Sequence, residues 1–221
     1  WDEITRTASH VETDILKKAL DQYPHTKAVI FTTPTYYGLV SEQLEEQISL
    51  CHELNIPVLI DEAHGAHFVA SNQLPKSALQ LGADIVVQSA HKTLPAMTMG
   101  SYLHVRSSLI DVEKVNRYLR MLQSSSPSYL IMASLDDARQ YVGTYLESDY
   151  TYLLEKREHF INSLKLIKGL VIVEVHDPLK LLLRVPGYSG FQFKEALMKQ
   201  NIYVELADMD QVLIILPLLK Q

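Results

Sequence analysis

Short apolar runs alternate with longer stretches of helical spacing through the first half of the chain. The runs lie at 28–32, 58–60, 85–88 and 101–105. A continuous apolar run of this length is typical of a strand buried on both faces of a parallel sheet. The last run follows a tight turn and is expected to pair antiparallel. Strand–helix–strand spacing predicts right-handed crossovers and a sheet covered by helices, which is an α/β fold.

Helix signals lie between and after these runs. Ser9 followed by Glu12 reads as a capping box that begins the first helix, and Pro24 ends it. Further helices are predicted over 41–54, 77–81, 108–122 and 129–167, the last with a bend near residue 143.

The pattern changes after about residue 169. Residues 170–175 and 179–185 flank a short turn and predict a hairpin. Ser189 is expected to cap a helix to about residue 200, and strands are predicted at 202–205 and 212–216. We therefore expect part of a large domain over 1–145 and the start of a small α+β domain over 146–221.

Composition and charge narrow the class of protein. The 221 residues are 47% hydrophobic and 21% charged, which fits a globular protein with a substantial core. The net charge of −6 with scattered basic residues argues against nucleic-acid binding. No apolar run approaches the ~20 residues that a membrane-spanning helix needs. The single cysteine, Cys51, excludes an internal disulfide and favours a reducing, cytoplasmic setting; its place in a helical apolar rhythm predicts a buried structural thiol.

A carboxylate and an amine stand at the ends of two predicted strands. Asp61 ends one, and Lys92 follows the next by a few residues. Ligands of open α/β sheets bind outside the carboxyl ends of the strands. A lysine that can form a Schiff base, with a carboxylate that keeps a ring nitrogen protonated, is what pyridoxal 5'-phosphate (PLP) requires. Ser89 and His91 could donate to the cofactor's phosphate.

Four stretches of the chain resemble a known family. They are Thr33–Gly38, Asp61–His67, Ser89–Leu94 and Ser124–Tyr129. Together they are similar to the bacterial ornithine/lysine/arginine decarboxylases, which are fold-type I PLP enzymes, over roughly residues 25 to 145. The resemblance implies a PLP-dependent transferase-like large domain, of the aspartate aminotransferase type, followed by a small α+β domain.

The resemblance also implies roles for individual residues around the cofactor. Lys92 would carry PLP as a Schiff base, and Asp61 would hold the pyridine nitrogen. Ala63 would pack against the ring face. Ser89 and His91 would bind the phosphate.

Two further residues acquire roles in the same way. Ser124 would reach the phosphate of a neighbouring subunit, so a homodimer or higher oligomer with shared active sites is expected. His64 would lie near the ring oxygen and the substrate. The catalytic residues would be Lys92, His64 and His91, each a candidate to return a proton to the substrate.

The implied reaction is decarboxylation of a basic amino acid to its amine and carbon dioxide. Such a reaction consumes a proton and can serve polyamine synthesis or acid resistance. The choice among lysine, arginine and ornithine stays open at this stage. We expect no metal; His64 and His67 with their acidic neighbours offer plausible ligand spacing, but no further ligand cluster supports a site.

Alternatives remain beside the decarboxylase. A PLP aminotransferase or lyase of the same fold would use the same lysine and aspartate. The chain also lacks a glycine-rich phosphate loop before residue 25, which suggests a fragment without the family's N-terminal part that binds PLP weakly or serves only as a folded scaffold. Tyr36 and Tyr37 are equally able to line the cleft or to pack.

Overall fold

The first half of the chain builds a mostly parallel sheet in the structure, a computed structural model that describes residues 1–221. In chain order its elements are α1 (Thr13–Gln22), β1 (Val29–Thr32), α2 (Leu44–Glu53), β2 (Val58–Asp61), the short 3-10 helix η1 (Phe68–Ala70), β3 (Ile85–Gln88), α3 (Ala90–Thr93) and β4 (Tyr102–Val105). The strands lie in the order β1-β2-β3-β4. The first three are parallel and β4 is antiparallel to β3, as the sequence predicts.

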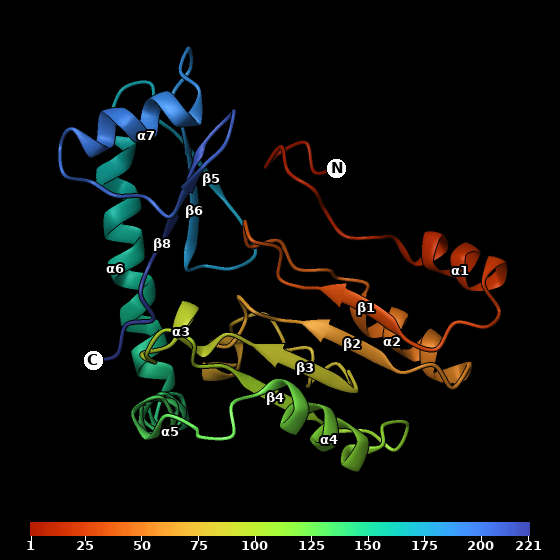
Figure 1. The fold of residues 1–221 in the computed structure, drawn as a ribbon. Helices are drawn as coiled ribbons and strands as arrows, with labels where there is room; N and C mark the ends of the chain where they lie inside the picture. The colour runs from red at the N-terminus through yellow and green to blue at the C-terminus, as the bar shows by residue number, and fades with distance from the viewer.

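The second half adds helices and an antiparallel sheet. Its elements are α4 (Val112–Leu122), α5 (Tyr129–Gly143), α6 (Glu147–Lys165), β5 (Val171–Glu174), β6 (Lys180–Arg184), α7 (Gly190–Met198), β7 (Leu206–Ala207) and β8 (Val212–Ile215). The sheet order is β5-β6-β8-β7. Figure 1 shows α6 running from the first sheet to the second, with α7 at the far end. The domain boundary expected at residue 145 falls between α5 and α6 and stays a prediction.

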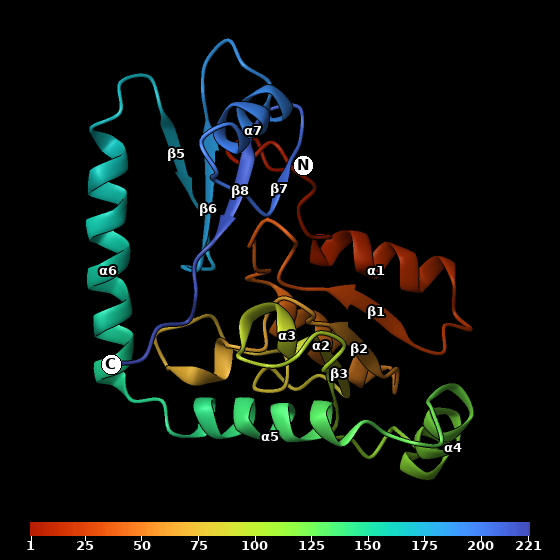
Figure 2. The same ribbon diagram turned by 60° about the vertical axis from the view of Figure 1, so that its left-hand side comes forward.

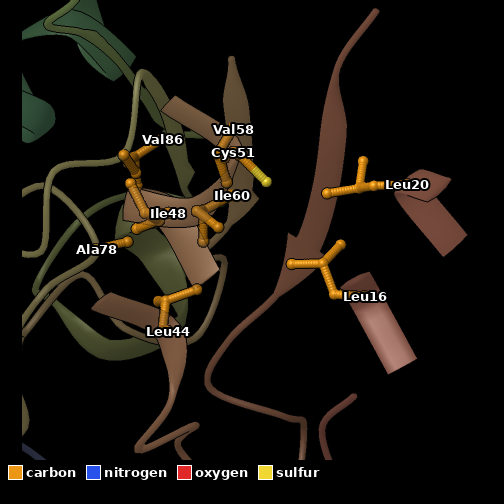
Figure 3. Packing of buried hydrophobic residues seen from close by; sticks show 10 residues of the cluster. Leu16, Leu20, Leu44, Ile48, Cys51, Val58, Ile60, Ala78 and Val86 are labelled. Carbon is orange, nitrogen blue, oxygen red and sulfur yellow. The ribbon is translucent and has the colours of Figure 1, made fainter. Parts of the chain in front are cut away.

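The main apolar core lies against one face of the parallel sheet (Figure 3). Helix α2 contributes Leu44, Ile48 and Cys51, which are at most 2% exposed. Other members come from α1, β2, β3 and the chain between β2 and β3: Leu16, Leu20, Val58, Ile60, Ala78, Ala83 and Val86. Cys51 is fully buried, which confirms the expected structural thiol, and burial raises the pKa of this thiol to about 11.

Strand β1 is not buried on both faces, contrary to the prediction. Val29 and Phe31 pack against the core, whereas Ile30 is 70% exposed. The reason is coverage: α1 and α2 pack against only one face of β1. The predicted strand at 202–205 is also misplaced, because the residues that pair with β8 are Leu206 and Ala207.

Several predicted helix features differ from the structure; among them, the helix expected from residue 108 begins at Val112. Ser9 does not cap α1; the side-chain carbonyl of Gln43 accepts the backbone N–H of Thr13 at 2.9 Å instead. Helix α2 begins at Leu44 rather than at residue 41. Residues 77–81 form turns, in which the Ser77 carbonyl accepts the N–H of Gln80 at 2.9 Å.

The predicted bend near residue 143 is a complete break between α5 and α6. The Asp149 side chain accepts the backbone N–H of Leu146 at 2.8 Å and thereby starts α6 afresh. Figure 2 shows α5 below the first sheet and α6 turned to run along the second. None of the helices combines the length and apolar character needed to cross a bilayer.

Candidate active site

Two loops meet at the carboxyl edge of the parallel sheet. Asp61 ends β2 and pairs in register with Val87 of β3, five residues before Lys92. The Asp61 Oδ1 atom accepts the N–H of Ala63 at 3.0 Å, which turns the chain after β2. On the neighbouring loop, the N–H of Lys92 donates to the carbonyl of Ser89 at 3.1 Å within the short helix α3.

The contact that joins the loops is between Lys92 and His64. The Nζ atom of Lys92 lies 3.1 Å from Nε2 of His64, whose side chain is buried. The ring of Tyr36, from the loop after β1, lies 4.3 Å from the His64 ring, centroid to centroid. Lys92 Nζ is 5.9 Å from the centroid of the same tyrosine ring. Segments after three successive parallel strands therefore converge on one amine.

A pocket of about 320 Å³ opens beside this amine. Six residues line it: Tyr36, His64, His91, Lys92, Glu205 and Ile215. The last two belong to the second sheet or the segment leading into it, so both halves of the chain form the pocket. The Tyr36 hydroxyl donates to the Glu205 carboxylate at 2.6 Å, and this hydrogen bond, with burial, raises the pKa of Tyr36 to about 12.

His64 is uncharged in this setting. Desolvation, followed by the positive charges of Lys180 and Lys92, lowers the pKa of His64 to about 3. A lysine ammonium can only donate hydrogen bonds, so Nε2 of His64 is the acceptor and its proton resides on Nδ1. The neutral imidazole thus holds the Lys92 amine in place without repelling it.

Three charged or titratable side chains are fully buried behind the pocket. Lys180, the first residue of β6, donates from Nζ to the carbonyl of Tyr36 at 2.8 Å and lies 5.9 Å from the Tyr36 ring centroid. Asp177 lies 3.0 Å from Nε2 of His67. Burial alone would raise the pKa of Asp177, but His67 and Lys180 outweigh it and lower that pKa.

Glycine is required where the loop after β1 crosses this cluster. Gly38 has φ +92°, and a Cβ atom there would lie 2.8 Å from Cγ2 of Val175 and 3.0 Å from Cδ of Lys180. The Gly38 carbonyl accepts the N–H of Asp177 at 3.0 Å. The loop that carries Tyr36 is therefore pressed directly against the chain segment that carries the buried charges.

The structure brings most of the candidate residues of the sequence to one edge. Lys92, His64 and His91 line the pocket, and Nδ1 of His91 is 2.9 Å from the carbonyl oxygen of Gly100. The other candidates on the β2 and β3 loops stand at the same edge but outside the pocket lining: Asp61, Ala63 and Ser89.

Ser124 is not part of this group. It is exposed in the loop between α4 and α5, where its hydroxyl donates to the carbonyl of Ser126 at 3.3 Å. The expected role of Ser124 in a neighbouring subunit stays a prediction.

Of the two tyrosines on the loop after β1, one lines the pocket and the other packs against the second sheet. Tyr36 lines the pocket, whereas Tyr37 packs against the core of the second sheet and donates its hydroxyl to Asp208 at 2.7 Å. His67, which the sequence offered as a possible metal ligand beside His64, has its Nε2 engaged by Asp177 instead.

Sequence reasoning missed Glu205, Lys180 and the His67–Asp177 pair. One feature of the sequence could have indicated Lys180, because it is a lysine inside the otherwise apolar run 179–183. No local pattern indicates Glu205, because its partner Tyr36 is 169 residues away in the sequence.

Solved structures establish the class of fold. The lysine decarboxylase LdcF of Francisella novicida superposes with a TM-score of 0.72 at 18% identity, covering 91% of this chain and 36% of that one. The chain shares this fold with a NifS-like protein from Rickettsia africae and with a histidinol-phosphate aminotransferase from Clostridium acetobutylicum, and it is the fold type I that the sequence predicts.

The family follows from the sequence comparison. Residues 3–173 match the Orn/Lys/Arg decarboxylase, major domain, and the chain belongs to this family. An uncharacterized protein of Bacillus subtilis (strain 168), YaaO, is 49% identical over 98% of the chain and 47% of its own length. The arginine decarboxylase of Halalkalibacterium halodurans is 34% identical over 97% of the chain and 46% of its own length. The chain thus spans about half the length of these relatives.

Proposed function

We propose that the protein is a PLP-dependent decarboxylase of a basic amino acid. The observation that carries this proposal is the Lys92 amine, 3.1 Å from Nε2 of His64, beside a pocket that also contains the carboxylate of Glu205. The family supports the reaction class. The chemistry of the pocket supports a cationic substrate.

The residues present fit the cofactor at several atoms. Lys92 is an exposed residue, and its Nζ atom is hydrogen-bonded only to His64. The Asp61 carboxylate is committed to Ala63 through Oδ1, which leaves Oδ2 for a ring nitrogen. The hydroxyl of Ser89 makes no capping bond to α3. An amine, a carboxylate and a hydroxyl free at one strand edge match the groups that PLP needs.

Each of these residues would have one task in the holoenzyme. Lys92 would hold the cofactor covalently, Asp61 would keep its ring nitrogen protonated, and Ser89 and His91 would hold its phosphate. When bound, PLP supplies an electron-withdrawing ring that stabilises the charge left at Cα when carbon dioxide departs.

The return of a proton to Cα falls to the chain's own groups. With a pKa of about 3, His64 carries no proton to give as an imidazolium at neutral pH. Lys92 or His91 would therefore act as the proton donor, and His64 would aim the Lys92 amine. The walls formed by Tyr36 and Ile215 would limit the access of water.

The distal cation of the substrate would interact with Glu205. Of the six residues that line the pocket, Glu205 is the only acidic one. A carboxylate in a partly desolvated pocket favours a cationic group over a neutral or acidic one. We propose arginine as the first substrate to test, since several relatives at 34–37% identity are arginine decarboxylases.

The complete site would form in a homodimer. Ser124 lies outside the pocket of its own chain, and the family resemblance implies that this residue would contact the phosphate of a second copy. Ser124→Ala would then weaken cofactor retention without changing the fold, and sedimentation would report a dimer for both proteins.

The proposal is tested by spectroscopy and product analysis on the purified protein with added PLP. We expect a visible absorption band, a mass increase on the Lys92 peptide after borohydride reduction, and release of carbon dioxide from arginine, lysine or ornithine. Lys92→Ala should abolish all three. Lys27→Ala, at an exposed lysine just before β1, serves as the control and should change none of them.

The alternatives predict other results. Transfer of the amino group to a keto acid without release of carbon dioxide would identify an aminotransferase. No band and no adduct, at any PLP concentration, would contradict the assignment of Lys92 and leave a folded module without this chemistry.

A further inference from the structure

Lys180 is the most unusual buried charge in the molecule. Its side chain is fully buried, although it stands in an apolar strand between Leu179 and Leu181. Burying an ammonium group is costly unless it is paired and hydrogen-bonded, so a strand position of this kind normally carries an apolar residue. Burial lowers the pKa of Lys180 to about 8.

The side-chain hydrogen bonds of Lys180 both go to the active-site loop. Nζ donates to the backbone carbonyl of Tyr36 at 2.8 Å and lies 3.4 Å from the carbonyl oxygen of Thr35. These hydrogen bonds hold the backbone of the loop that carries the Tyr36 side chain. The ring is 4.3 Å from the His64 ring, and Nζ atoms of both Lys180 and Lys92 lie 5.9 Å from its centroid.

We propose that Lys180 is a positioning residue, which fixes Tyr36 against His64 and holds His64 uncharged so that it accepts a hydrogen bond from the Lys92 amine. This inference rests on the site of the proposed function and extends it to a residue outside the pocket. Lys180 acts through Tyr36 and His64 and needs no contact with the substrate.

The charges around His64 come from several elements. Lys92 on α3 and Lys180 on β6 oppose a positive charge on the imidazole, and so does His67 on the loop after β2. Asp177, just before β6, favours a positive charge. His91 and Glu205 line the same pocket. Lys180 therefore lowers the pKa of His64 and Asp177 raises it. Substituting each residue in turn can distinguish an effect of charge from an effect of loosened packing.

The test is the titration of His64 by nuclear magnetic resonance on ring-labelled histidine. The protein has nine histidines, so His64→Gln identifies the resonance of interest. In the unaltered protein we expect a neutral imidazole, with Nε2 unprotonated, from pH 8 down to at least about pH 5. In Lys180→Met, which keeps an unbranched side chain one atom shorter and removes the charge, the midpoint should rise by about one pH unit or more.

The matched variant is Lys180→Met combined with Asp177→Asn. If charge governs His64, removing the aspartate as well lowers the midpoint again relative to Lys180→Met alone. Equal midpoints in the two variants would mean that loosened packing caused the rise, and the proposal would be wrong. Asp177→Asn alone should not raise the midpoint.

The unaltered protein provides a test even if the Lys180 variants fail to fold. A His64 that titrates near 6.5, as an exposed histidine does, overturns the proposal without any variant. The titration needs neither cofactor nor substrate. A failed decarboxylase assay therefore leaves this result intact, and a normal His64 titration leaves the decarboxylase proposal intact.

Discussion

Two buried regions of this protein differ in chemistry more than in depth. The core formed by α2, β2 and β3 is built from side chains such as Ile48, Val58 and Ile60, each at most 2% exposed. The cluster where β6 meets the loops after β1 and β2 contains His67, Asp177 and Lys180, which are buried just as completely. Burying apolar surface stabilises a fold, whereas burying charge opposes folding unless partners compensate for it.

The same two regions also differ in how completely their buried polar atoms are hydrogen-bonded. Five buried side-chain atoms have no hydrogen-bond partner, and they belong to Thr33, His64, His67, Thr93 and Asp177. They lie on the loops after β1 and β2, at the end of α3 and just before β6, and none lies in the apolar core. Because unpaired buried polar groups cost stability, the second region is organised for the chemistry of the pocket at some expense to the fold.

The largest effect is expected from breaking the charged cluster. Asp177→Ala leaves His67 and Lys180 buried without their carboxylate, and should lower the free energy of unfolding by about 3–5 kcal/mol. Urea denaturation followed by circular dichroism measures it. The double variant His67→Leu with Asp177→Leu should lose less unfolding free energy than the single variant Asp177→Ala. A larger loss in the double variant would show that the pair itself is strongly stabilising.

Acid should weaken the charged region through His64. Its pKa is about 3 in the folded protein and 6.5 in the unfolded chain, so the unfolded state binds more protons between these values. The contribution of His64 is complete above pH 6.5 and is lost as the pH falls toward 3. Between pH 6.5 and 5.0 the loss is up to about 2 kcal/mol.

Comparison with His64→Gln isolates this contribution. The variant lacks the imidazole, so its unfolding free energy should fall less than that of the unaltered protein over the same pH interval. Parallel pH profiles for the two proteins would mean that His64 is not held neutral.

The apolar core should tolerate a small change at modest cost. Ile48→Val removes one methyl group from a side chain that is 2% exposed, and should cost about 0.5–1.5 kcal/mol. The same urea experiment measures the change. A cost as large as that of Asp177→Ala would remove the proposed contrast between the two regions.

The smallest effect is expected at the exposed face of β1. Ile30 is 70% exposed, so Ile30→Ala should change stability by less than about 0.5 kcal/mol. A loss above 1 kcal/mol, measured in the same way, would indicate that another chain or segment covers this face in solution.

The elements that the sequence predicts well are those set by local patterns. The runs that became β2 and β3 each begin with three consecutive apolar residues, and such a run is enough to predict a strand of a parallel sheet. Asp61 and Lys92 could be assigned to one edge because parallel strands present their carboxyl ends together. Local capping patterns succeeded at Ser189, whose hydroxyl accepts the N–H of Gln192.

Other features depend on residues too distant for any local pattern. Ser9 was a reasonable cap for α1, but Gln43 accepts the N–H of Thr13 from 30 positions away. The apolar run of β1 gave no indication that one of its faces would be open, since that depends on which elements cover the sheet.

The sequence by itself determined the fold class, the family and the location of Asp61 and Lys92 at one sheet edge, because short-range periodicity and motif spacing encode them. Only the tertiary structure decided that Glu205 enters the pocket and that His67, Asp177 and Lys180 are buried behind it. Tyr36 meets Glu205 across 169 residues, and His67 meets Asp177 across 110. Such contacts arise where the loops after β1 and β2 meet the chain segments of the second sheet, and no pattern of neighbouring residues contains them.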